Sequence, residues 1–150
     1  MSTTKVTLPN AIMLGEVTRL LQEGHTVVMM TKGNSMMPFI VGERDSVELF
    51  RTPDIMVGHI ALAQIRPGHY VLHRIIAMDG DAVTLKGDGN LKGTEKCMVS
   101  DISGVVSRII RPGKKDLDCL TKRFDMRSRR WRLAPYIFRR FYLAIYRRII

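Results

Sequence analysis

Residues 32–38 read Lys32-Gly33-Asn34-Ser35-Met36-Met37-Pro38, a sequence that predicts a tight, irregular turn. Gly33 tolerates backbone dihedrals that other residues avoid, and Pro38 favours an extended conformation at Met37. A turn of this kind can present the hydroxyl of Ser35 outward. Because a serine hydroxyl is a weak nucleophile by itself, a catalytic role for Ser35 requires a base elsewhere in the chain.

Two segments further along the chain supply a candidate base and a candidate acid. His73 and Arg74 interrupt the apolar run 70–76, and polar side chains are unusual inside a purely structural strand. Asp88 follows a second strand-like run, 82–85, in a turn flanked by glycines. An Asp-Gly pair between the two runs predicts an antiparallel hairpin, which would bring Asp88 back toward His73.

In these three segments the chain resembles the serine peptidase superfamily that joins type I signal peptidases to the self-cleaving SOS repressors. Segment 33–38 is similar to the family's Gly-x-Ser-Met-x-Pro nucleophile box. His73-Arg74 falls where bacterial signal peptidases have Lys-Arg, and where the endoplasmic-reticulum and archaeal-type enzymes have His-Arg. Segment 86–90 resembles the Lys-Gly-Asp-x-Asn segment of the latter group. The resemblance covers about residues 26–112, the bulk of the chain.

The resemblance implies a mainly β domain of short antiparallel strands in which Ser35 is the nucleophile and His73 the general base. Asp88 is expected either to orient His73 and stabilise its charged form or to cap its own turn. Glu95 is the alternative third group, and Lys86 is a rival base. The implied function is that of a serine endopeptidase working through an acyl-enzyme intermediate. Its substrate would be an extended segment of a peptide or protein, either signal- or leader-peptide-like or part of its own chain.

The chain departs from the family pattern beside the nucleophile. Gly33 stands where many signal peptidases carry a serine that donates to the oxyanion. The expected donors are therefore backbone N–H groups of the Ser35 turn, helped by the Asn34 side chain. The other residues of the turn are assigned to turn support (Met36) and to the substrate pocket (Met37 and Pro38).

A histidine base makes different demands on the site from a lysine base. Histidine, with an ordinary pKa of about 6.5, is mostly neutral at physiological pH, whereas lysine, at about 10.4, must be desolvated first. Arg74 is expected to pair with a carboxylate or to support the fold. His59 and His69 lack metal-ligand spacing relative to His73, and segment 87–90 lacks the Gly-Lys-Ser/Thr ending of a P-loop. We therefore expect no metal and no cofactor.

The rest of the N-terminal part predicts one helix and several short strands. Asn10 can cap a helix that ends at Gly24, with apolar residues at helical spacing between them. Alternating or continuous apolar runs predict further strands at 27–30, 46–50, 57–65, 97–99 and 104–110. An apolar content of 45% suits one ordinary core.

The formal charge of +10 is concentrated near the C-terminus. Residues 1–121 contain 14 Lys and Arg against 13 Asp and Glu, whereas residues 122–150 contain 10 against 1. We therefore expect a nearly neutral peptidase-like domain over 1–113, a linker over 114–128 and a basic amphipathic tail over 129–150.

The tail predicts a helix that is uninterrupted from about Ala134 to the end of the chain. Its apolar stripe (Phe138, Phe141, Tyr142, Ile145, Ile149) is flanked by arginines (Arg139, Arg140, Arg147, Arg148). Such a helix suits the surface of an anionic membrane. The alternatives are that the stripe packs on the peptidase domain or on another copy of the chain, which would make a homo-oligomer.

The same features are compatible with two other functions, and they also suggest a location for the protein. A non-catalytic peptide-binding module on the same fold is one alternative function, and a nucleic-acid-binding protein using the basic tail is another, less favoured one. The N-terminus has no secretory signal, and no run of about 18 apolar residues predicts a membrane-spanning helix. Cys97 and Cys119 lack metal or redox spacing and are expected as free thiols. A cytoplasmic protein, or one peripheral at the cytoplasmic membrane face, is expected.

Overall fold

The protein is described by a computed structural model, which defines residues 3–6 and 11–150. Its strands are β1 (Thr3–Val6), β2 (Thr26–Met30), β3 (Ser46–Phe50), β4 (Ile60–Arg66), β5 (His69–Asp79), β6 (Ala82–Lys86), β7 (Glu95–Met98), β8 (Ile102–Ile110) and β9 (Leu117–Asp118). Its helices are α1 (Ala11–Gln22), the short 3-10 helix η1 (Val99–Asp101), α2 (Lys122–Leu133) and α3 (Tyr136–Ile149). The expected cap at Asn10 lies outside the described residues.

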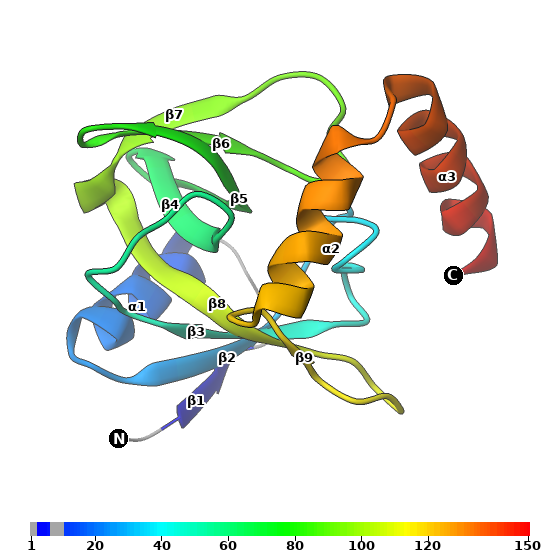
Figure 1. The fold of residues 1–150 in the computed structure, drawn as a ribbon. Coiled ribbons are helices and arrows are strands. Elements are labelled where there is room, and N and C mark those ends of the chain that lie inside the picture. Colours follow the sequence, from blue (N-terminus) through cyan, green and yellow to red (C-terminus); the bar gives the residue numbers. More distant parts are fainter. Residues whose placement is uncertain (1–2, 7–10) are drawn as a thin grey trace.

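The described strands form one strongly bent, mainly antiparallel sheet (Figure 1). Their order is β1-β2-β3-β8-β4-β5-β6-β7, with β9 pairing β8. Only β1 and β2 pair in parallel. The mainly antiparallel β architecture and the helices near both ends agree with the sequence expectation.

The β5–β6 hairpin is the part of the sheet that matters most for the site. Asp79 pairs with Ala82 across the turn, and Gly80 has a φ of 58°. This confirms the hairpin predicted from the Asp-Gly pair. The preceding strand begins later than expected, at Ile60, because Gly58 has a φ of 101° and leaves the conformation of a strand.

The main core lies between α1, the sheet and the C-terminal helices. Val17 and Leu21 of α1 are fully buried in it together with Leu49 of β3. The same cluster includes Phe124 and Trp131 of α2. Helix α2 is therefore part of the folded body rather than an appendage.

The segment expected as a linker, 114–128, differs from that expectation. It contains β9, and α2 already begins at Lys122, where the Thr121 hydroxyl accepts a hydrogen bond from Phe124 N–H at 3.2 Å. The polar composition of this segment does not predict a helix, because the buried residues of α2 lie on one face only. Two helices rather than one follow, because the residue before Pro135 is disfavoured in helical conformation and the chain is extended at Ala134.

Candidate active site

The turn that carries Ser35 is held by hydrogen bonds across a long loop between β2 and β3. Gly33 has a φ of 76°, and a side chain at Gly42 would lie 2.0 Å from the Gly33 carbonyl oxygen. The two backbones approach this closely because Gly42 has no side chain, and Gly33 adopts the positive φ that the turn requires. The Asn34 side-chain oxygen accepts a hydrogen bond from Gly42 N–H at 3.3 Å. Asn34 therefore supports the turn.

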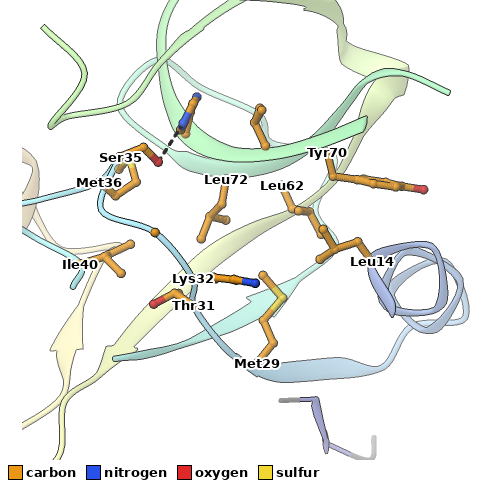
Figure 2. A pocket seen from close by; sticks show the side chains of 13 residues that line it. Leu14, Met29, Thr31, Lys32, Ser35, Met36, Ile40, Leu62, Tyr70 and Leu72 are labelled. Atoms are coloured by element: carbon orange, nitrogen blue, oxygen red, sulfur yellow. Dashed lines mark hydrogen bonds between the residues drawn. The ribbon is translucent and has the colours of Figure 1, made fainter. Parts of the chain in front are cut away.

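Ser35 and His73, 38 residues apart in the sequence, form a hydrogen bond. Ser35 Oγ lies 3.0 Å from His73 Nε2, and His73 is 7% exposed. Strand β5 pairs His73 with Ala61 of β4, so the residue next to His73 on the neighbouring strand has a small side chain. This hydrogen bond is the dashed line that starts at Ser35 in Figure 2. The geometry suits proton transfer from the hydroxyl to the imidazole.

Glu95 completes a line of three side chains. Its Oε1 lies 2.5 Å from His73 Nδ1. Glu95 is the first residue of β7, where it pairs with Leu85 of β6. A carboxylate in this position accepts the hydrogen bond from Nδ1–H, which leaves the Nε2 lone pair directed at Ser35. The sequence favours Asp88 for this position, with Glu95 as the alternative third group.

Asp88, the first candidate for that role, is bound elsewhere. Its carboxylate accepts hydrogen bonds from Arg74 Nε at 2.8 Å and Arg74 Nη2 at 2.6 Å. Successive side chains of a strand point to opposite faces, so His73 and Arg74 cannot share one partner easily. The expectation that Asp88 orients His73 is thus corrected, and the expectation that Arg74 pairs with a carboxylate is confirmed.

The Arg74–Asp88 pair lies in the interior beneath helix α2. The Arg74 guanidinium lies 5.4 Å from the centre of the Phe39 ring and 5.6 Å from that of Phe124. Trp131 Nε1 donates a hydrogen bond to the Asp88 carbonyl oxygen at 2.8 Å. Helix α2 therefore closes this ion pair off from water.

The loop after β6 packs directly on the turn that carries Ser35. Gly89 N–H donates to the Ser35 carbonyl oxygen at 2.8 Å. A side chain at Gly87 would lie 2.4 Å from that oxygen and 3.2 Å from His73 Nε2. Asp88 N–H lies 3.4 Å from Met36 Sδ. Loop 86–90, which carries the third family-like segment, therefore supports Ser35 through its backbone and not through the Asp88 carboxylate.

A cavity of about 340 Å³ opens beside Ser35 and His73 (Figure 2). Its walls are mostly apolar and come from α1, β2, the Ser35 loop, β4 and β5: Leu14, Met29, Met36, Ile40, Leu62 and Leu72. Thr31, Lys32 and Tyr70 add polar groups. We call this the substrate cavity.

Neither residue expected to line that cavity does so. Met37 is fully buried in the core, and Pro38 lines a different cavity under α2 and α3. Met36, which was expected to support the turn, lines the cavity. Sequence reasoning missed Met29 and Leu72. The available signal was the alternation of apolar residues in their strands, but it does not say which face is hollow.

The other candidates lie away from Ser35. Lys86 lines a separate cavity of about 240 Å³ beside Trp131. Burial lowers the pKa of His59, whose Nδ1 accepts a hydrogen bond from Met56 N–H. Over the described residues, no group of three or more His, Cys, Asp and Glu side chains could hold a metal ion.

Both cysteines are free thiols. Burial raises the pKa of Cys97 to about 11 and that of Cys119 to about 12. Both thiols therefore stay protonated at neutral pH and are poor nucleophiles. Ser35 remains the best-placed nucleophile of the site.

No protein-family model and no curated protein sequence matches this chain. None of the helices in the described part of the chain is both long and apolar enough to cross a membrane.

Proposed function

We propose that the chain is a serine endopeptidase related to the type I signal peptidases and the SOS-repressor autoproteases. The single observation that carries this proposal is the line Ser35–His73–Glu95, with hydrogen-bonding distances of 3.0 Å and 2.5 Å. A structural histidine needs neither a serine hydroxyl on one nitrogen nor a carboxylate on the other. Finding both on one imidazole beside an apolar cavity is the arrangement that acyl transfer requires.

The proposed reaction follows from these positions. Ser35 Oγ attacks the carbonyl carbon of the scissile bond while His73 Nε2 takes the hydroxyl proton. The same proton then passes to the leaving amine, and an acyl-enzyme ester remains on Ser35. Water hydrolyses this ester, again with His73 as the base, and Glu95 stabilises the imidazolium in both steps.

The neighbourhood of the site favours an extended substrate. Among the described strands, β6 pairs with β5 only between Arg74 and Asp79, so residues 70–72 have no strand partner on that side. An extended peptide can add to such an edge by backbone hydrogen bonds. One of its side chains would then enter the substrate cavity, whose walls favour an apolar group.

Labelling with a fluorophosphonate probe tests the proposal without knowledge of the substrate. The wild-type protein should form a covalent adduct on Ser35, identified by mass spectrometry of the digested protein. Ser35→Ala should not be labelled, whereas Ser100→Ala, at an exposed serine outside the site, should be labelled like the wild type. A folded wild-type protein that is never labelled would favour the alternative, a peptide-binding module without catalysis.

A further inference from the structure

A second cavity, of about 380 Å³, lies between the sheet and the two C-terminal helices. Five cationic side chains line it: Arg44, Arg111, Lys114, Arg127 and Arg130. No carboxylate is among its lining residues, and five aromatic rings complete the wall. We call it the basic cavity. Its lining is suited to a group that is negatively charged.

Most of these cations have no acidic partner. Arg44 pairs with Asp45, whose carboxylate lies 2.8 Å away. Over the described residues, no ion pair involves Lys114, Arg127 or Arg130. Arg111 Nε is buried and has no hydrogen-bond partner there. Like charges held together in this way repel one another, so a bound anion would relieve the repulsion.

Helix α3 carries an apolar strip on its outer side. Leu143 is 3% exposed and packs on the body of the protein. Residues on the opposite side of the helix are 56–73% exposed: Ile137, Phe138, Phe141, Ile145 and Ile149. We call these five residues the outer strip. Phe138 belongs both to this strip and to the wall of the basic cavity, so the two features are continuous.

Charge decides what can cover the outer strip. Residues 122–150 contain 10 Lys and Arg and a single acidic residue, Asp125. A second copy of the chain would bring two such segments together, and their charges would oppose the contact. An anionic bilayer instead offers phosphates to the cations and an apolar layer to the strip.

We propose that helices α2 and α3 bind the surface of an anionic phospholipid membrane, with the outer strip in the interfacial layer and a lipid phosphate in the basic cavity. The long arginine side chains can reach phosphates while the rings of α3 enter the layer below them. The proposal does not depend on Ser35, and so it is independent of the peptidase activity.

Vesicle flotation of the full-length protein tests this proposal. The protein should float with phosphatidylglycerol vesicles at low salt and should remain at the bottom with phosphatidylcholine vesicles. Arg127→Gln/Arg130→Gln and Phe141→Ser/Ile145→Ser should each weaken partitioning at least ten-fold. Thermal unfolding of each variant should show that it is folded under the conditions of the experiment.

Matched controls test whether flotation depends on the surface of α2 and α3 in particular, or on any exposed charge or apolar side chain. Arg66→Gln/Lys92→Gln removes two exposed cations elsewhere, and Ile12→Ser removes an apolar side chain that is 84% exposed on α1. Both controls should float like the wild type, as should Ser35→Ala. A Ser35→Ala variant that floats would keep this proposal intact even if the peptidase proposal failed.

Three outcomes would overturn the membrane proposal. The first is failure of the wild-type protein to float with anionic vesicles. The second is equal loss of flotation in the matched controls. The third is a dimer in sedimentation without lipid that Phe141→Ser/Ile145→Ser dissociates, because a second copy would then cover the strip. Binding of inorganic phosphate without flotation would also exclude the membrane and leave only an anion site.

Discussion

At the scale of the residue, the two hydrogen-bond partners of His73 determine which of its ring nitrogens carries the hydrogen. Glu95 accepts from Nδ1 and Ser35 donates to Nε2, so each bond defines the role of the other nitrogen. In the proposed reaction, the chemistry therefore belongs to the group of three and not to any one side chain. Removing one member should disable the others as well.

The first prediction concerns Ser35 and His73. Ser35→Ala and His73→Ala should each lower the rate of peptide cleavage on the order of 10³-fold or more, because each removes one partner of the same proton transfer. The double variant should be no slower than the worse single variant. The measurement is single-turnover cleavage of a peptide library, with products identified by mass spectrometry. Additive losses would show that the two residues act separately.

The second prediction separates the two carboxylates. Glu95→Gln should reduce fluorophosphonate labelling by on the order of 10²–10⁴-fold while leaving the unfolding midpoint in urea nearly unchanged, because the change affects the imidazole and not the core. Asp88→Asn should leave labelling of the folded protein nearly unchanged but lower its stability. The variant leaves Arg74 buried without a charge partner, which costs about 3–5 kcal/mol of stability. If Glu95→Gln labels normally in a folded protein, Glu95 is not the third group.

The contrast between Asp88 and Glu95 shows which residues of the site can be predicted from the sequence and which cannot. The three segments that resemble the peptidase family singled out Ser35 and His73, and the structure brings these two side chains within hydrogen-bonding distance. The partner of His73 depends instead on which face of β5 each neighbouring loop reaches. That choice is made by the pairing of β6 with β7, which brings Glu95 alongside Leu85, and no local pattern in the sequence reports it.

At the scale of the element, helix α2 connects the C-terminal part of the chain to the site around Ser35 through side-chain contacts. Its Phe124 ring covers Arg74, and its Trp131 indole binds the carbonyl of Asp88. The same loop, 86–90, supports Ser35 through Gly89 N–H. Two hydrogen bonds, Trp131 to Asp88 and Gly89 to Ser35, therefore connect α2 to the turn that carries Ser35 through this loop.

The composition of α2 explains why it was expected as part of a linker. Its sequence is dominated by arginines, and only three of its residues are buried: Phe124, Ser128 and Trp131. A helix that buries so narrow a face has little apolar periodicity to detect. Strands β2, β3 and β8 were easier to predict because both their composition and their apolar patterns favour strands.

A third prediction follows for truncated proteins. A chain ending at Ala134 keeps α2 and should remain folded and reactive with the fluorophosphonate probe, although removal of Leu143 from the core should lower its unfolding temperature. A chain ending at Gly113 loses Phe124 and Trp131 as well, and each such loss from a core costs about 3–5 kcal/mol. It should be unfolded by circular dichroism and unreactive. A folded, reactive 1–113 fragment would show that α2 is dispensable.

At the scale of the whole molecule, the two proposals concern surfaces joined by one short segment. Ser35 lines the substrate cavity, and Pro38 and Phe39, three and four residues later, line the basic cavity. The turn that carries Ser35 thus lies between the place where a peptide would bind and the place where a membrane would bind. Such an arrangement suits a substrate that is itself held at the membrane surface.

The last prediction tests this combination, and it rests on both proposals. A cleavable peptide carrying a fatty acyl chain should be cut faster than the same peptide without the chain when phosphatidylglycerol vesicles are present, because binding to one surface raises the effective concentration of substrate near the enzyme. Without vesicles at a peptide concentration below micelle formation, the two peptides should be cut at similar rates. Phe141→Ser/Ile145→Ser should abolish the advantage of the acylated peptide while leaving cleavage of the soluble one unchanged, whereas Ile12→Ser should preserve it. An acyl-chain advantage that persists in the Phe141→Ser/Ile145→Ser variant would mean that the lipid chain is recognised by the substrate cavity itself, and that α3 does not bring the enzyme to its substrate.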